Sequence, residues 1–208
     1  MVQYMEWLKA FLFGIVEGIT EWLPISSTGH MILFNQFFPM NVSEAFMEMF
    51  RVVIQFGSIL AVLVLYFDRL NPWSKRKTAG QKTRTWRLWG KVILAAVPAG
   101  IVGVLFDDWM NAHFYTYTVV AIALIVYGIA FIVIERVRGN KAAKAKKAED
   151  ISVGQSVAVG CFQVLSLIPG TSRSGSTIMG ALIAGVSRTA AAEFSFFLAI
   201  PVMLGASL

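Results

Sequence analysis

Two carboxylates lie close together in an apolar stretch near the start of the sequence. Glu17 and Glu21 are four residues apart, which places both on one face of a helix. In apolar surroundings the two charges repel each other and are costly to desolvate, so they need a shared proton, a basic partner or a metal ion. Divalent cations such as Mg²⁺ and Ca²⁺ prefer oxygen ligands, and Mg²⁺ commonly binds one or two carboxylates together with substrate phosphate. Glu17 and Glu21 are therefore predicted metal ligands; the alternative is an acid pair hydrogen-bonded to a neighbouring helix.

A run of small polar residues follows the acid pair and ends in a histidine. It consists of Ser26, Ser27, Thr28, Gly29 and His30. Hydroxyl groups and a glycine at the start of a helix can form a simple cap, or they can bind an anion at the positive end of the helix dipole. The histidine can act as a nucleophile, as the base for a serine or as the acid for a leaving group, although a lone histidine is often a satisfied core residue.

The second polar segment is centred on an arginine. Arg173 lies in the run Pro-Gly-Thr-Ser-Arg-Ser-Gly, with no Asp or Glu within nine residues on either side. A permanent charge in an apolar region needs an anion, and the planar guanidinium group suits phosphate. The alternative is a structural ion pair with Glu17 or Glu21, which would also bring the two segments together. Further candidates for phosphate contacts in this segment are Thr171, Ser172, Ser174 and Gly175.

The two segments together favour phosphoryl transfer. Carboxylates alone would repel a phosphate, whereas an arginine and hydroxyl groups alone would bind one without cleaving it. Acids, a metal, hydroxyl groups, a histidine and an arginine make up the usual set of groups for phosphoryl transfer. Their position within apolar sequence indicates a lipid-linked substrate.

The composition indicates a membrane protein. Of the 208 residues, 57% are hydrophobic and only 14% are charged, and the mean hydropathy is +0.67. Soluble domains carry about a quarter of charged residues, so this chain lacks the polar groups needed to cover a soluble surface. Residues 52–67, 92–106 and 119–134 are apolar enough to be spanning helices. We therefore predict an all-α polytopic integral membrane protein that forms a single membrane domain over residues 1–208.

Loop charge sets the predicted orientation in the membrane. Fourteen of the 18 Lys and Arg residues lie within residues 68–91 and 135–150, which we place in the cytoplasm. Residues 107–118 contain two acids and no Lys or Arg, so we place them outside. The positive-inside rule accounts for the basic runs, and no nucleic acid is expected as a partner.

Two further apolar stretches break at the polar segments and resemble each other. Residues 8–25 and 153–168 each lead into a small polar loop, after which the chain becomes apolar again. The matching pairs at an offset of 146 are Gly14 and Gly160, Glu17 and Gln163, Ser26 and Ser172, Thr28 and Ser174, and Gly29 and Gly175. By loop parity the two copies enter from opposite sides. We predict an inverted-topology repeat, about 1–67 and 151–208, with two re-entrant or broken helices meeting near the membrane midplane.

The motifs resemble a known family. Glu-Gly-Ile-Thr-Glu-Trp-Leu-Pro-Ile-Ser-Ser-Thr-Gly-His and Pro-Gly-Thr-Ser-Arg-Ser-Gly are similar to the two signature motifs of the undecaprenyl-diphosphatase family of the bacitracin-resistance type. The resemblance covers nearly the whole chain. It implies hydrolysis of undecaprenyl diphosphate to undecaprenyl phosphate, with a divalent cation, in a pocket that opens toward the outer face. This reaction recycles the carrier lipid of peptidoglycan and cell-wall synthesis and gives bacitracin resistance.

The resemblance also implies roles for individual residues. It places Glu17, Glu21, Ser27, His30 and Arg173 in the site. Ser27 is the better candidate for the nucleophile, Glu21 serves with the metal or as base, and Arg173 holds phosphate; the choice between Ser27 and His30 stays open. Family members continue through further spanning helices, so helices beyond residue 208 are expected to be missing from this sequence. A homodimer is left open.

Two other functions were weighed. A transporter or flippase of a phosphorylated polyprenyl lipid also fits inverted repeats with broken helices, but it needs no nucleophile beside an acid pair. An enzyme of the phosphatidic-acid-phosphatase type would pair two histidines. The second histidine of this sequence, His113, lies in the predicted external loop and far from Arg173 in sequence, so that class ranks low.

Overall fold

The structure is a computed structural model that describes residues 2–114, 116–138 and 142–206. Over these ranges the chain is helical, as predicted, apart from loops and one isolated bridge between Ala145 and Val186. In chain order the helices are α1 (Val2–Thr20), α2 (Ser27–Phe37), α3 (Glu44–Leu65), α4 (Phe67–Leu70), α5 (Ala79–Phe114), α6 (Tyr117–Arg138), η1 (Ala148–Asp150), α7 (Val153–Gln163), η2 (Val164–Leu167), α8 (Arg173–Ile183) and α9 (Arg188–Ala206).

Within the described residues, four helices are long and apolar enough to cross a membrane. They cover Glu44–Leu65, Ala79–Phe106, Thr118–Arg138 and Arg188–Gly205. The first three correspond to the spans that the sequence predicts, except that the first helix ends at Leu65 and not at residue 67. Their outward faces carry large apolar side chains, as in Val104, which is 85% exposed, and such a surface is stable against lipid. The protein is therefore a multi-pass membrane protein.

The predicted loops on both sides of residues 92–106 are wrong in extent. Helix α5 begins at Ala79 and ends at Phe114, so residues 79–91 and 107–114 are helical. Hydropathy marks only the apolar middle of such a helix, whereas its basic end is rich in Lys, Arg and Gln, which are good helix formers. Helix α6 likewise extends to Arg138, into the predicted loop 135–150, of which residues 139–141 lie outside the described ranges.

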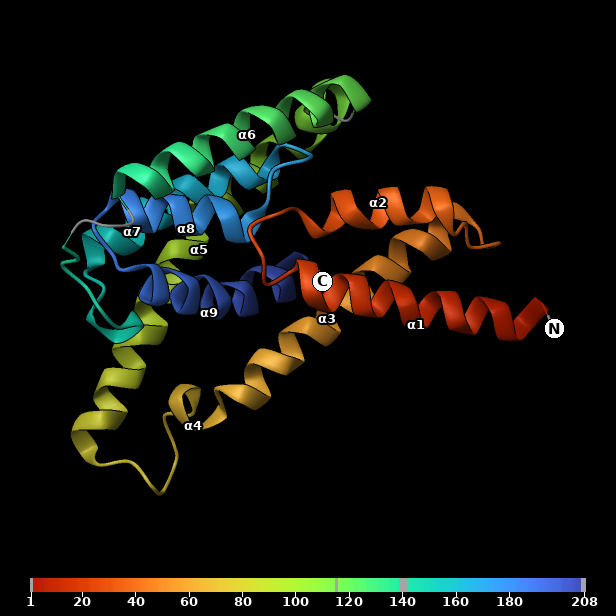
Figure 1. Cartoon of the computed structure of the whole chain (residues 1–208). Helices are drawn as coiled ribbons and strands as arrows, with labels where there is room; N and C mark the ends of the chain where they lie inside the picture. The colour runs from red at the N-terminus through yellow and green to blue at the C-terminus, as the bar shows by residue number, and fades with distance from the viewer. Residues whose placement is uncertain (1, 115, 139–141, 207–208) are drawn as a thin grey trace.

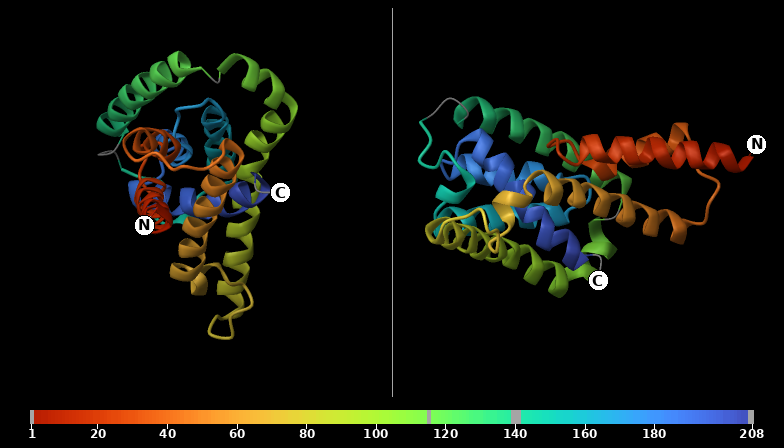
Figure 2. Two further views of the ribbon diagram at one scale, coloured as in Figure 1. Left: turned by 90° about the vertical axis from the view of Figure 1, so that its right-hand side faces the viewer. Right: turned by 90° about the horizontal axis from the view of Figure 1, so that it is seen from below.

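The breaks between α1 and α2 and between α7 and α8 share the same serine-to-glycine cap hydrogen bond, although Ser26 has φ 58° and Ser172 has φ −84°. The Ser26 hydroxyl group accepts a hydrogen bond from the Gly29 amide at the start of α2. Ser172 accepts one from the Gly175 amide at the start of α8 in the same way. These four residues form two of the pairs related by the offset of 146. The N-terminal helices lie to one side of α7 and α8, and the two loops meet between them (Figures 1 and 2).

Helix α9 lies at the centre of the packing. Phe194, Phe197 and Leu198 are fully buried and pack in the main apolar core. The helix contacts α3, α5 and α8, so it links the N-terminal part of the chain to the C-terminal part. Because α9 is packed between these helices, the positions of its polar residues are fixed.

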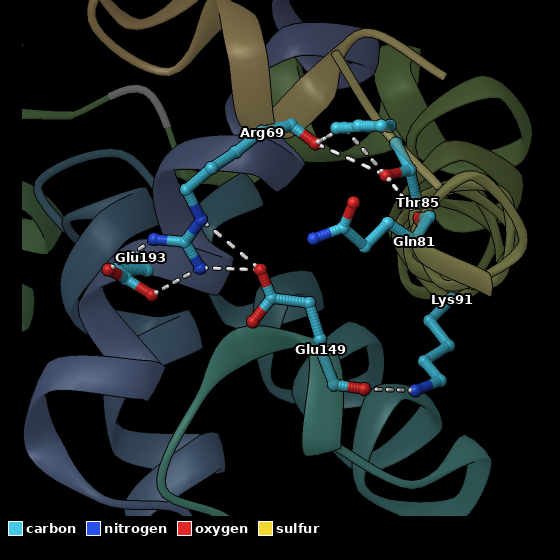
Figure 3. A network of polar contacts seen from close by, with 7 residues as sticks. Arg69, Gln81, Thr85, Lys91, Glu149 and Glu193 are labelled. Carbon is cyan, nitrogen blue, oxygen red and sulfur yellow. Dashed lines mark hydrogen bonds and ion pairs between the residues drawn. The ribbon is translucent and has the colours of Figure 1, made fainter. Parts of the chain in front are cut away.

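A polar network fixes the basic end of the molecule (Figure 3). The Arg69 guanidinium group donates to Glu193 at 2.7 Å and to Glu149 at 2.6 Å, joining α4, α9 and η1. Lys77 donates to the Arg69 carbonyl and to the Thr85 hydroxyl group, both at 2.8 Å. Burial would raise the pKa of the Glu149 carboxyl, but the hydrogen bond and charge of Arg69 outweigh burial and hold the pKa below its ordinary value.

The contact between α5 and α7 generates a stability prediction. A methyl group on Gly160 would lie 2.5 Å from the Ala95 carbonyl oxygen and 3.0 Å from its Cα, both backbone atoms. Gly160→Ala should therefore destabilise the protein by about 1–3 kcal/mol and lower the midpoint of thermal unfolding in detergent.

Gly154→Ala is the matched control on the same helix. A Cβ atom there meets nothing within 4 Å, and Ala is the better helix former, so the midpoint should stay the same or rise slightly. Equal midpoints for the two variants would contradict the close packing of α7 on α5.

Candidate active site

A serine and a glutamate form the closest polar contact between the end of α1 and the start of α2. The Ser27 hydroxyl group donates to Glu21 Oε2 at 2.6 Å, and both side chains are buried. Glu21 continues from α1, its amide bonded to the Glu17 carbonyl at 2.9 Å, and Ser27 is the first residue of α2. A carboxylate at this distance from a hydroxyl group is positioned to take its proton.

The turn before Ser27 has an unusual backbone. Ser26 has φ 58° and ψ 90°, and it is the one non-glycine residue with positive φ in the described ranges. Residues outside the common backbone regions cost of the order of 1–3 kcal/mol and persist where the surroundings hold them. Here the cap to Gly29 and two hydrogen bonds from His30 to the Ser26 carbonyl hold the turn.

His30 contacts the turn rather than the serine–glutamate pair. Its Nδ1 lies 2.9 Å from the Ser26 carbonyl oxygen, and because a carbonyl only accepts, Nδ1 must be the donor. In neutral His30 the Nε2 atom therefore carries the lone pair. Within the described part of the chain, no hydrogen bond joins His30 to Ser27 or Glu21.

Arg173 joins the second segment to the first. Its Nη2 donates to Glu21 Oε1 at 2.6 Å, and its Nη1 donates to the Ser195 carbonyl of α9 at 3.1 Å. The two charged side chains are only 12% and 8% exposed. A second contact across the loops runs from the Ser174 hydroxyl group to the Leu23 carbonyl at 3.1 Å. One Glu21 carboxylate thus contacts both Ser27 and Arg173, so the ion pair weighed as the alternative for Arg173 is present.

The other predicted phosphate contacts are engaged in shaping the loops. The Thr171 hydroxyl group bonds the Leu165 and Ile168 carbonyls, and Ser172 lies 3.1 Å from Ser174 besides capping α8. A side chain on Gly175 would collide with the Tyr127 hydroxyl group, so this position needs glycine. Thr28 is exposed on α2, and Gly29 donates its amide to Ser26.

The starts of α2 and α8 still offer amide groups to an anion. The first N–H groups of a helix have no acceptor within the helix. The caps use the Gly29 and Gly175 amides, which leaves the amides of Ser27 and Arg173 at the positive ends of the two helices. The site can therefore bind an anion through backbone groups as well as through Arg173.

The surroundings of Glu17 are consistent with the divalent cation that the acid pair Glu17 and Glu21 predicts. It is fully buried, and neither of its carboxylate oxygens has a hydrogen-bond partner among the described residues. A buried charge without a partner is strongly unfavourable, so a proton or a cation must compensate it. The described residues contain no group of three or more His, Cys, Asp or Glu side chains placed to hold a metal. Glu17 and Glu21 would thus supply one or two ligands, and phosphate and water the others, as is usual for Mg²⁺.

Two residues near Arg173 are supporting groups that the sequence did not single out. The Thr177 and Ser195 hydroxyl groups lie 2.6 Å apart, and both side chains are fully buried. Thr177 also bonds the Arg173 and Ser174 carbonyls of its own helix. The only sequence signal was the presence of two hydroxyl residues within apolar helices, which must find partners when they are buried.

The comparison with known proteins agrees with the two motifs. Residues 10–208 match the family described as bacitracin resistance protein BacA. The chain belongs to this family. Both loops of the site lie within the matched range, so the resemblance drawn from their motifs is confirmed.

Individual relatives of this BacA-family chain are named undecaprenyl-diphosphatase. The protein of Enterococcus faecalis is 57% identical over 199 residues, which cover 96% of this chain and 72% of the relative. The protein of Limosilactobacillus fermentum is 55% identical over 98% of this chain and 74% of the relative. The protein of Streptococcus pyogenes is 54% identical over 98% of this chain and 73% of the relative.

The contact between Thr177 and Ser195 generates a prediction for the BacA-family site. Thr177 donates to a carbonyl, so it accepts from Ser195. Thr177→Val removes the acceptor of a buried hydroxyl group and should cost about 1–3 kcal/mol, whereas Ser195→Ala removes the whole group and should cost less, about 0.5–1.5 kcal/mol.

Thermal unfolding of the purified variants in detergent measures this order. The double variant should be less destabilised than the sum of the two single variants, because the two groups act on each other. Additive effects, or a larger loss in Ser195→Ala, would contradict the hydrogen bond as assigned.

Proposed function

We propose that this protein hydrolyses undecaprenyl diphosphate to undecaprenyl phosphate and phosphate in the bacterial plasma membrane. The observation that carries the proposal is the Glu21 carboxylate, which contacts Ser27 and Arg173 at 2.6 Å each. The relatives named undecaprenyl-diphosphatase, at 54–57% identity over nearly the whole chain, support the same substrate. The reaction would recycle the carrier lipid for cell-wall synthesis, and the family description connects it with bacitracin resistance.

Ser27 is the proposed nucleophile. Its Oγ would attack the terminal phosphorus while Glu21 takes the proton, forming the Oγ–P bond and breaking the bond from phosphorus to the bridging oxygen. Undecaprenyl phosphate leaves, and water then hydrolyses the phosphoserine to free phosphate. Arg173 and the first amides of α2 and α8 would stabilise the charge on the equatorial oxygens. His30 has its Nε2 available as an acid or base, but among the described residues it makes no hydrogen bond with Ser27, whereas Ser27 is bonded to Glu21, which favours the serine over the histidine as nucleophile.

Glu17 and Glu21 are the proposed holders of a divalent cation, Mg²⁺ or Ca²⁺. The buried, unpartnered oxygens of Glu17 are the supporting observation. When bound, the ion would neutralise charge on the diphosphate and orient it.

The proposal includes an inverted-topology repeat with the site open toward the outer face. The support is the pair of serine caps at an offset of 146, each accepting from the glycine amide three residues on, and the contact between the two loops. The outward orientation rests on the basic segments at 68–91 and 135–150, which the positive-inside rule places in the cytoplasm. A homodimer is part of the proposal only as an expectation, to be checked by the mass of the protein in detergent.

Lipid transport is the second candidate, favoured by the paired broken helices alone. A transporter needs a phosphate site and an exit path. It gains nothing from a serine hydroxyl group held against a carboxylate, so that contact favours the hydrolase.

Phosphate release from undecaprenyl diphosphate by the purified protein tests the reaction. Ser27→Ala should abolish release, Glu21→Gln should lower the rate about 100- to 10,000-fold, and Arg173→Lys about 100- to 1000-fold. Lysine keeps the charge of Arg173 but not the planar pair of donors.

Ser43→Ala is the control, because Ser43 is a serine outside the site, where it caps α3. It should keep full activity. Release that survives in Ser27→Ala but is lost in His30→Gln would assign the nucleophile to the histidine. Lipid exchange across vesicles without any release would favour the transporter.

Metal dependence tests the role of Glu17. A chelator should stop release, and added Mg²⁺ or Ca²⁺ should restore it. Glu17→Gln should raise the cation concentration for half-maximal rate at least about tenfold, since one charged ligand is lost. Glu6→Gln, on the same helix but paired with Lys9, is the control and should leave this concentration unchanged. Activity that is indifferent to the chelator would contradict the cation.

A further inference from the structure

A hollow apolar surface lies at the basic end of the molecule, apart from the two loops of the site. A pocket of about 610 Å³ is lined by Leu63, Phe67, Trp73, Trp86, Trp89 and Ile93, among others. Trp89 is fixed there, because its indole N–H donates to the Leu70 carbonyl at 2.8 Å. Figures 1 and 2 show α4 and the start of α5 at the end of the molecule away from the loop between α1 and α2.

This apolar pocket continues into a cationic one. A pocket of about 720 Å³ shares Phe67 and Trp73 with it and adds Lys75 and Arg76. A third pocket, of about 710 Å³, shares Arg76 and adds Lys77, Arg84, Lys146 and Lys147, besides several acids. The surface therefore changes from wholly apolar to charged over a short distance, which is the polarity pattern of an amphiphile.

The positive charge at this end exceeds the negative charge that the protein supplies. Residues 69–91 contain eight Lys and Arg residues and no Asp or Glu. Arg69 is satisfied by Glu149 and Glu193 (Figure 3), and Arg76 has only an exposed contact with Asp68 at 3.6 Å.

Other cations here have no protein partner. Lys75, Arg84 and Lys146 make no hydrogen bond through the side chain and no ion pair with any part of the chain that the structure describes. These groups can bind an external anion.

The position of the surface along the spans indicates the occupant. The apolar part of α3 ends at Leu65 and that of α5 begins at Val92, so the pockets lie where the two spans leave the hydrocarbon. Trp73 and Trp86, 74% and 51% exposed, stack edge to face at 5.2 Å on the rim. Tryptophan beside Lys and Arg is typical of the membrane interface, where lipid phosphates lie.

We propose that this surface binds an anionic glycerophospholipid, with its phosphate at Lys75, Arg76 and Arg84 and one acyl chain along Trp73, Trp86 and Ile93. The apolar pocket gives a chain-bearing ligand an advantage over free phosphate or an acidic peptide. The excess of cations selects an anionic headgroup over a zwitterionic one. The site is separate from the catalytic loops and does not depend on the proposed reaction.

Native mass spectrometry of the intact protein, released from mixed micelles, tests the site. The unmodified protein should retain phosphatidylglycerol in preference to phosphatidylcholine. Lys75→Gln with Arg76→Gln should weaken this retention about 30-fold, since each basic residue near a lipid surface contributes about 1 kcal/mol and each step of about 1.4 kcal/mol is a factor of ten. Lys82→Gln with Arg87→Gln removes the same charge from the neighbouring first turns of α5, at residues that line none of the three pockets, and should change little.

A second measurement keeps the protein in vesicles. Phosphatidylglycerol with brominated chains should quench tryptophan fluorescence more than brominated phosphatidylcholine does, and Trp73→Phe with Trp86→Phe should remove this excess. If the two charge variants weakened lipid retention equally, diffuse attraction would explain the binding and the proposal would be wrong. Equal retention of phosphatidylglycerol and phosphatidylcholine would also overturn it. Displacement of phosphatidylglycerol by an equal concentration of undecaprenyl phosphate would overturn the assigned occupant, because the site would then belong to a polyprenyl lipid.

Discussion

The ion pair between Glu21 and Arg173 is the constraint on which the rest of the structure depends. The two groups come from loops separated by 152 residues, and each is nearly excluded from solvent. An unpaired charge in such surroundings is so unfavourable that one loop cannot be placed without the other. The pair therefore acts between the N-terminal helices and the α7–α8 hairpin, and the same carboxylate holds Ser27. The docking of the two loops and the orientation of Ser27, the proposed nucleophile, both depend on the buried Glu21 carboxylate.

Residues of α6, α8 and α9 support Arg173 in addition to its ion pair with Glu21. The Ser195 carbonyl takes its second donor, and Thr177 links that turn of α9 to α8. Tyr127 of α6 closes against Gly175 and donates to the Ser172 carbonyl at 3.3 Å. Helix α9 also carries Glu193, which holds Arg69 at the basic end. One buried helix thus contributes, through residues two positions apart, to the proposed phosphate-binding loop and to the polar network around Arg69.

Residue chemistry could be predicted from the sequence because charged groups in apolar segments leave few alternatives. Glu17, Glu21 and Arg173 stood out for that reason, and the offset of 146 anticipated the matching caps of Ser26 and Ser172. Which atoms meet could not be predicted, since Arg173 had two acids to choose from and His30 several partners. The length of α5 was missed because polar helix ends carry no hydropathy signal. Ser195 was missed as a support because it acts on Arg173 through a backbone carbonyl, which every residue has.

The resting ion pair also bears on how the proposed reaction begins. Arg173 donates from Nη2 to Glu21 and from Nη1 to Ser195, while its buried Nε has no partner among the described residues, so a phosphate that binds at Nη2 displaces the carboxylate. The exchange replaces one anion with another, and the guanidinium group never loses its partner, which keeps the loss of free energy small. Glu21 then has one cationic partner fewer at the moment when Ser27 must give up its proton. Substrate binding would thus release the base that the nucleophile needs, and an empty site would hold that base in an ion pair.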